Sequence, residues 1–465
     1  MAIASRGAPV LSCAAGPGAA RAPIPTPRRA AWPTFVALIP CRPPMRTSPP
    51  EIVTTDAARR LLDTPRWGLD PSLTFLNHGS YGALPRPVAQ AQAAYRDRME
   101  RDPVTFFKAD LEGLLDGVRE RLGAFLNCRP NDLALVTNAT IALCTILNAT
   151  PLAPGDEILI TDHEYQSLLN ELERVCARTG ARVVAAPIPF PNTDPATVAE
   201  RVIAAITPRT RLVFVSHITS GSALVLPVKP IVEACTRCGI DVVVDGAHAP
   251  GQVPVDIRAL APTYYVGSGH KWLSAPKGSG FVYVRPDRQG TFRPLALSSR
   301  VHKVRPERSL FLRDYDYFGT GDYSALLSIP QAIESMGSLL PGGWPALMRH
   351  NHDLIMRGRG LVCRALGIPE PAPELMVGTM ASIPLPPCPP EVQAQPTRFD
   401  DPLQDALLER HGIVTPIWTV GPNAQRIVRI SAQAYNAIPQ YEHLAHALRE
   451  ELARERRAGG EVAAA

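Results

Sequence analysis

Two neighbouring stretches decide the fold: residues 241–250 read DVVVDGAHAP, and residues 264–273 read YYVGSGHKWL. In each stretch a short apolar run gives way to small and polar residues, which is typical of a buried strand followed by a loop. Similar runs occur on both sides of this pair, several of them separated by helix-length segments. The predicted strands are residues 133–136, 157–160, 182–185, 212–215, 242–244, 264–266 and 281–284.

Helix-length segments between the early strands predict a mostly parallel sheet covered by helices. The clearest of these segments are residues 168–179, 196–206 and 229–238. We therefore expect an α/β fold whose large domain contains a mostly parallel, seven-stranded sheet.

The 465 residues are also enough for a second, smaller domain. After a helix-rich segment that starts near residue 330, a strand is predicted at 426–430 and a terminal helix at 440–456. These elements predict a large domain over 51–335, to which a segment at 70–90 adds active-site residues, and a C-terminal α+β domain over 336–455. Residues 456–465 are expected to form a flexible tail.

The first 50 residues contain six arginines and no aspartate or glutamate. They lack the apolar core of a secretory signal, and their prolines would interrupt the amphipathic helix of an organelle transit peptide. We expect a disordered extension or a misassigned start, with Met45 as the alternative first residue.

Composition excludes several classes of protein. The net charge of +5 comes without a Lys/Arg-rich block, so neither nucleic acid nor a membrane surface is an expected partner. Nine scattered cysteines do not form a disulfide framework and fit a reducing, cytoplasmic setting. Cys235 and Cys238 form a single C-x-x-C, which we interpret as part of a helix ending at Gly239 rather than a metal or redox site.

The chemistry of the protein centres on an aspartate and a lysine on consecutive strands. Asp245 lies at the carboxyl end of strand 242–244, where open α/β sheets bind their ligands, and Lys271 follows the next strand. A lysine amine in a fixed loop can form a Schiff base with a carbonyl group, and a carboxylate can pair with a protonated pyridine nitrogen. Each residue alone could be a helix cap or a surface lysine, but together they predict a pyridoxal-phosphate (PLP) site.

Two further loops fit this cofactor. Residues 133–140 read LALVTNAT and run into a helix, whose free N–H groups and the Thr140 hydroxyl could bind a phosphate. Residues 161–167 read TDHEYQS, so either His163 or Tyr165 could stack on a planar ring or simply be a loop residue. No strand–G-x-G-x-x-G–helix unit is present, which argues against a nicotinamide enzyme.

Along the chain these elements follow in the order phosphate loop, stacking aromatic, aspartate and lysine. With this order the chain resembles the class-V aminotransferase family of fold-type I PLP enzymes, and within it the isopenicillin N epimerase-like branch. The resemblance extends from about residue 70 to about residue 450. It is carried by LNHGSYGA, TDHEYQS, SHITSGSALVLPV, VDGAHAPGQVPVD, GSGHKWL and RISAQAYN.

The resemblance implies a role for each matching residue. Lys271 would hold the cofactor and move the α-proton, Asp245 would bind the pyridine nitrogen, His248 would lie beside the ring, and Tyr165 would stack on it. Ser220 stands where many relatives have an asparagine near the cofactor's O3′. The expected phosphate-binding residues are Ala139, Thr140, Ser268 and His270.

The resemblance also implies a substrate site and a homodimer. Arg429 would bind the substrate α-carboxylate, although it could be an ordinary strand arginine. Asn77 and His78 would line the substrate side. Thr320 would reach the phosphate of the partner subunit. No metal is expected.

The reaction itself stays open, because one PLP site serves several chemistries. We expect action at the α-carbon of an amino acid or its derivative, as an epimerase or aminotransferase. The alternative is a C–S lyase acting on a cysteine derivative or sulfoxide, and a non-catalytic PLP-fold protein is the second alternative. Cys388, in PPCPP, lies in a stiff segment and is not expected to act as a desulfurase nucleophile.

Overall fold

The computed structural model describes residues 67–191, 194–302 and 305–459. These residues belong to one compact unit. The expectations about residues 1–50, including Met45, lie outside the described residues, as does the end of the expected C-terminal tail.

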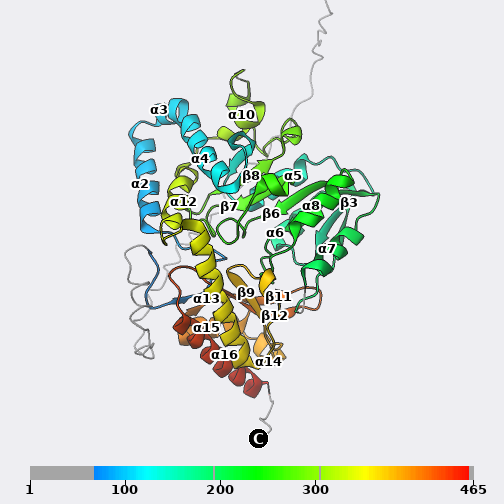
Figure 1. The fold of residues 1–465 in the computed structure, drawn as a ribbon, viewed down its shortest axis with the longest axis vertical. Helices are drawn as coiled ribbons and strands as arrows, with labels where there is room; N and C mark the ends of the chain where they lie inside the picture. Colours follow the sequence, from blue (N-terminus) through cyan, green and yellow to red (C-terminus); the bar gives the residue numbers. More distant parts are fainter. Residues whose placement is uncertain (1–66, 192–193, 303–304, 460–465) are drawn as a thin grey trace, which may run out of the picture. The chain divides into compact units, whose positions relative to one another are not determined.

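The central sheet has seven strands and confirms the predicted fold class (Figure 1). Its order is β2-β8-β7-β6-β5-β3-β4. Only β8 runs against its neighbours, pairing antiparallel with β2 and β7, while the other pairs are parallel. The strands are β2 (Leu133–Val136), β3 (Glu157–Thr161), β4 (Arg182–Ala186), β5 (Thr210–Ser216), β6 (Asp241–Asp245), β7 (Tyr264–Ser268) and β8 (Gly280–Val284).

Both faces of this sheet are buried, which explains the uninterrupted apolar runs of its strands. Val242 and Val244 belong to one hydrophobic cluster, whereas Val243 between them belongs to another. Successive side chains of a strand point to opposite faces, so the two clusters lie on opposite sides of the sheet. The first contains residues of α4 (Leu111–Leu126), α7 (Pro195–Ala204) and α8 (Val228–Arg237), and the second contains residues of α5 (Ala139–Ala149) and α6 (Gln166–Thr179).

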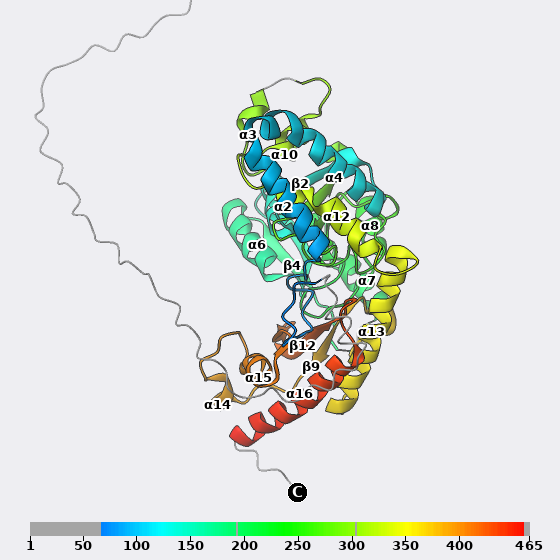
Figure 2. The same ribbon diagram turned by 90° about the vertical axis from the view of Figure 1, so that its left-hand side faces the viewer.

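The C-terminal part contains a three-stranded antiparallel sheet in the order β11-β12-β9. Its strands are β9 (Met380–Pro384), β11 (Ile417–Val420) and β12 (Gln425–Ser431). Two long helices, α13 (Gly343–Leu366) and α16 (Ile438–Ala458), run side by side next to this sheet (Figure 2). The predicted strand 426–430 and terminal helix 440–456 correspond to β12 and α16. β9 and β11 were not predicted.

The N-terminal segment joins this C-terminal part. β1 (Thr74–Phe75) pairs in parallel with β10 (Ile413–Val414), next to α15 (Pro402–His411). The loop after β1 thereby lies between the two sheets, where it meets both Lys271 and Arg429. The short or peripheral helices are α2 (Arg86–Arg101), α3 (Pro103–Thr105), the π-helix η1 (Phe106–Asp110), η2 (Pro130–Asp132), α9 (Ile257–Leu260), η3 (Pro286–Arg288), η4 (Ser299–His302), α10 (Leu310–Asp316), α11 (Ser324–Leu327), α12 (Ile329–Gly337), η5 (Glu374–Met376) and α14 (Pro390–Gln393).

The C-x-x-C of Cys235 and Cys238 can be compared with the structure. α8 ends at Arg237 and is followed by Cys238 and a left-handed Gly239, as the helix interpretation of the C-x-x-C predicts. None of the helices in the described ranges is long and apolar enough to cross a membrane.

Candidate active site

A cavity of about 340 Å³ lies at the carboxyl edge of the seven-stranded sheet. Parallel strands end at this edge, so the loops that follow them converge there. Ten of the residues predicted from the sequence line the cavity: Ala139, Thr140, Tyr165, Ser220, Asp245, His248, Ser268, His270, Lys271 and Arg429.

Lys271 is placed by the tight loop after β7. Its Nζ lies within hydrogen-bonding distance of His248 Nε2, at 3.1 Å. Burial lowers the pKa of Lys271 to about 8, and the nearby Asp245 carboxylate acts in the opposite direction. Burial also holds the pKa of His248 well below its usual value, so this imidazole is neutral. The neutral, nucleophilic fraction of the Lys271 amine at neutral pH is therefore larger than for an exposed lysine, although most of the amine still carries a proton.

Asp245 ends β6 with its carboxylate buried at the base of the cavity. Its Oδ1 accepts the N–H of Ala247 at 2.9 Å, and burial raises the pKa of the carboxyl group. Among the described residues, no arginine or lysine lies within ion-pair distance of it. A buried carboxylate with so few partners is stabilised by a cation placed in the cavity, and a protonated pyridine ring fits that requirement.

The N-terminus of α5 opens onto the same cavity. Asn138 caps the helix, its side chain accepting the N–H of Ile141 at 2.9 Å. The N–H groups of Ala139 and Thr140 belong to the first turn and have no acceptor within the helix. Together with Ser268 and His270, which line the cavity after β7, they form a concave surface suited to a phosphate.

Arg429 enters the cavity from β12 of the C-terminal sheet. Its Nη1 donates to the backbone oxygen of Ser220 at 2.7 Å, and its Nη2 donates to Ser80 Oγ at 2.8 Å and Asn77 Oδ1 at 3.2 Å. Its guanidinium carbon lies 4.6 Å from the centre of the Trp418 ring, a cation–π arrangement. Burial lowers the pKa of Arg429 to about 9, so the group stays charged at neutral pH. Within the described ranges Arg429 has no carboxylate partner. A group that binds a substrate carboxylate must lack such a partner, so Arg429 meets this requirement.

The loop after β3 brings Tyr165 rather than His163 to the cavity wall. The Tyr165 ring centre is 5.9 Å from Lys271 Nζ, and the residue is 46% exposed. His163 turns away and its Nδ1 bonds to Ser222 Oγ at 2.7 Å. Of the two rings left open by the sequence, Tyr165 therefore has the position for stacking on a bound ring.

Three predicted residues do not line this cavity. Asn77 lies behind Arg429 and orients it. His78 is buried beneath the site, where its Nδ1 meets the Tyr435 hydroxyl at 2.8 Å and its Nε2 meets the Lys271 backbone oxygen at 3.1 Å. Burial lowers the pKa of His78 to about 3. Its position therefore supports a structural role in holding the Lys271 loop rather than contact with substrate. Thr320 is exposed and bonds only to Tyr317 among the described residues.

Sequence reasoning missed several cavity residues. Ser80 and Tyr81 stand inside the quoted motif LNHGSYGA, so a signal was present but was not used. Trp418 lies on β11, a strand that was not predicted, and nothing in the local sequence marks it as a cavity residue.

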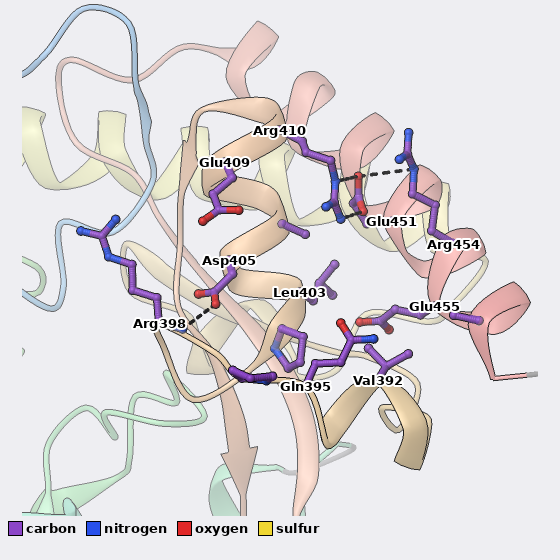
Figure 3. A pocket seen from close by; sticks show the side chains of 14 residues that line it. Val392, Gln395, Arg398, Leu403, Asp405, Glu409, Arg410, Glu451, Arg454 and Glu455 are labelled. Atoms are coloured by element: carbon purple, nitrogen blue, oxygen red, sulfur yellow. Dashed lines mark hydrogen bonds and ion pairs between the residues drawn. The ribbon is translucent and has the colours of Figure 1, made fainter. Parts of the chain in front are cut away.

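A separate cavity of about 420 Å³ lies among α14, α15 and α16 (Figure 3). Its charged groups mostly satisfy one another: Arg410 and Arg454 both reach Glu451, and Asp405 accepts the backbone N–H of Arg398. Across the described residues no cluster of His, Cys, Asp or Glu has the arrangement of a metal site. The cavity around Lys271 differs from this separate cavity, because it contains a buried amine and a buried carboxylate without an ion-pair partner in the described part of the chain.

The fold and this cavity define a fold-type I PLP enzyme: the lysine, the buried aspartate, the helix N-terminus and the stacking ring all fit that cofactor. Comparison with known proteins gives the family. The sequence pattern of the family described as "Aminotransferase class-V" matches residues 82–355, more than half of the chain. The protein therefore belongs to the class-V aminotransferase family and depends on pyridoxal 5′-phosphate.

Individual relatives agree with this assignment. The chain is 37% identical to isopenicillin N epimerase of Amycolatopsis lactamdurans, over 82% of this chain and 96% of that protein. It is 27% identical to a probable chloroplastic L-cysteine desulfhydrase of Arabidopsis thaliana, over 82% and 83% of the two chains. Among solved structures, the apo cysteine desulfurase of Thermococcus onnurineus NA1 has a TM-score of 0.68 at 19% identity, covering 88% of this chain and 99% of that chain. A likeness at that identity concerns the fold alone.

Proposed function

We propose that the protein moves a proton at the α-carbon of an amino acid or its derivative, as an epimerase or an aminotransferase. One observation carries this proposal: the Lys271 amine and the Arg429 guanidinium line the same cavity of about 340 Å³. The first is a base and the second is a carboxylate receptor. An α-amino acid is the kind of molecule that needs both.

Each residue then has a defined task. Arg429 binds the substrate α-carboxylate, while Ser80 and Asn77 fix the guanidinium in its plane. The Lys271 amine, lowered in pKa by burial, takes the α-proton and returns it. Bound PLP supplies an electron sink for the charge that develops at the α-carbon. Asp245 would hold the pyridine nitrogen, Tyr165 and His248 would lie against the ring, and Ser220 would lie near its O3′.

The phosphate of the cofactor would be held by Ala139, Thr140, Ser268 and His270. The support is their common position around the N-terminus of α5, where the helix dipole favours an anion. Burial lowers the pKa of His270, so it would act there as a neutral hydrogen-bonding group.

The test is a product analysis with the PLP form of the enzyme and a panel of L- and D-amino acids in deuterated water. An inverted substrate carrying deuterium at the α-carbon would identify an epimerase. Conversion of the cofactor to pyridoxamine phosphate would identify an aminotransferase. A protein that acquires no visible cofactor absorbance after PLP is added would contradict the proposal.

A C–S lyase acting on a cysteine derivative is the alternative function, and the relatives named L-cysteine desulfhydrases favour keeping it. Release of pyruvate and a sulfur product would identify it. A persulfide mechanism has less support, because no cysteine stands among the cavity residues and burial raises the pKa of Cys388 to about 11. A protein that bound PLP but turned over nothing in the panel would favour the non-catalytic alternative.

We also propose a homodimer in which Thr320 of one subunit reaches the phosphate site of the other. Thr320 is exposed, as is the apolar side chain of Phe318 two residues before it, and Val104 and Leu297 are further large apolar side chains that are exposed. The free thiols of the described cysteines fit a reducing compartment such as the cytoplasm.

A further inference from the structure

A second compartment adjoins the cavity around Lys271. It has a volume of about 430 Å³, and we call it the outer compartment. Its walls are residues 162–166, Leu169, residues 220–222, Asp400 and residues 418–421. It shares three wall residues with the inner cavity: Tyr165, Ser220 and Trp418.

The shared residues are also those next to the two groups that would hold a substrate. The Tyr165 ring is 5.9 Å from Lys271 Nζ, and the Trp418 ring is 4.6 Å from the guanidinium carbon of Arg429. Ser220 accepts a hydrogen bond from the same guanidinium at 2.7 Å. The outer compartment therefore lies next to the place where an α-carbon held between Lys271 and Arg429 would stand, separated from it by these three residues.

The two spaces differ in charge. The inner cavity contains the cations Lys271 and Arg429, whereas none of the residues lining the outer compartment is a lysine or an arginine. Asp162 and Asp400 both line the outer compartment, and neither pairs with a lysine or arginine among the described residues. A carboxylate entering this space would meet like charge, whereas an amide or an ammonium group would not.

A third carboxyl group, Glu164, lies in the wall but contributes less charge. It is buried and accepts hydrogen bonds from Ser216 Oγ at 2.6 Å and Thr161 Oγ1 at 2.8 Å. Burial raises the pKa of Glu164 to about 7, so part of it is neutral at neutral pH. The selectivity of the compartment therefore depends mainly on Asp162 and Asp400.

We propose that the outer compartment receives the side chain of the substrate, and that this side chain is extended and ends in a neutral amide or a cation rather than a carboxylate. The proposal rests on the proposed function, since it needs Arg429 and Lys271 to hold the amino-acid end. A substrate as small as cysteine would leave the outer compartment empty.

The first experiment compares kcat/KM for alanine, cysteine, glutamine, glutamate and lysine. Glutamine and glutamate have nearly the same shape and differ in charge, so their ratio reports the electrostatics of the wall. We expect glutamine and lysine to exceed glutamate by about tenfold. Calorimetric binding of the α-methyl derivatives, which have no α-proton to lose, should give the same order without turnover.

Two variants locate the effect. Thr419→Trp adds bulk at an exposed wall position on β11 and should lower the ratio of glutamine to alanine turnover. Asp400→Asn should reduce the preference for lysine over glutamate by about threefold, because an exposed carboxylate has a modest effect. Glu409→Gln, in the separate cavity of Figure 3, is the matched control and should leave every ratio unchanged.

The outcomes separate this inference from the function it rests on. If no amino acid reacts, the proposed function fails. If small amino acids react but extended ones do not, or if glutamate equals glutamine and lysine, the function stands and the outer compartment is not the side-chain site. Unchanged selectivity in both Thr419→Trp and Asp400→Asn would also overturn the inference.

Discussion

Lys271 is the residue on which the proposed chemistry depends. Its lowered pKa predicts how the rate of PLP uptake changes with pH. Below pH 8 most of the amine carries a proton and cannot attack a carbonyl, whereas above pH 8 most of it is free. The rate at which the cofactor-free protein takes up PLP should therefore rise with pH, with a midpoint near 8. Appearance of the visible cofactor band measures this rate. Lys271→Ala should show no attachment that borohydride can trap, and a flat pH profile in the wild type would contradict the assignment.

Gly82 illustrates how closely the N-terminal loop approaches the lysine. A Cβ at this position would lie 2.3 Å from the backbone oxygen of Lys271, closer than any allowed contact. Gly82→Ala should therefore lower the free energy of unfolding by about 1–3 kcal/mol and weaken PLP binding. Gly113→Ala is the control, because Gly113 lies in helix α4 with no atom within 4 Å of its added Cβ. That substitution should stabilise the helix by about 0.5–1 kcal/mol, and equal melting temperatures of the two variants would refute the steric argument.

Helix α5 is the element that would hold the cofactor phosphate. Thr140→Glu places a negative side chain at its N-terminus inside the cavity, where it would repel an anion. The dissociation constant for PLP should rise by about tenfold or more, as fluorescence titration of the cofactor-free protein would measure. Pyridoxal, which has no phosphate, serves as the control ligand. If the variant weakens pyridoxal and PLP equally, the phosphate is held elsewhere.

At the scale of elements, the sequence predicts the central sheet far better than the C-terminal one. Strands such as β6 are buried on both faces and therefore appear as unbroken apolar runs. β11 is only partly buried and carries no such run, so Trp418 could not be placed beside Arg429. For His78 the sequence motif identified the residue but not its contacts. Only the fold shows that its ring bonds to the Tyr435 hydroxyl and to the backbone oxygen of Lys271. Contacts between segments distant in sequence, such as β1 with β10, leave no local signal.

At the scale of the molecule, the cavity around Lys271 combines parts that are far apart in the chain. The inner wall comes from loops of the seven-stranded sheet, and Arg429 and Trp418 come from the C-terminal sheet. Any change in how these parts pack would move Arg429 relative to Lys271. The loop after β1 bonds to both Lys271 and Arg429, so a change in that loop would affect the placement of both residues.

The proposed homodimer is a further prediction at this scale. Leu297 is 56% exposed and Phe318, two residues before Thr320, is 37% exposed, and a partner subunit could cover both side chains. We expect light scattering to give twice the mass of the chain, and the double variant Leu297→Asp/Phe318→Asp to give a monomer that binds PLP more weakly. Leu375→Asp changes an even more exposed leucine on η5 and should leave both the mass and the affinity unchanged. A wild-type protein that is monomeric yet binds PLP tightly would show that Thr320 takes no part in the phosphate site, because the residue could not then reach a second cavity.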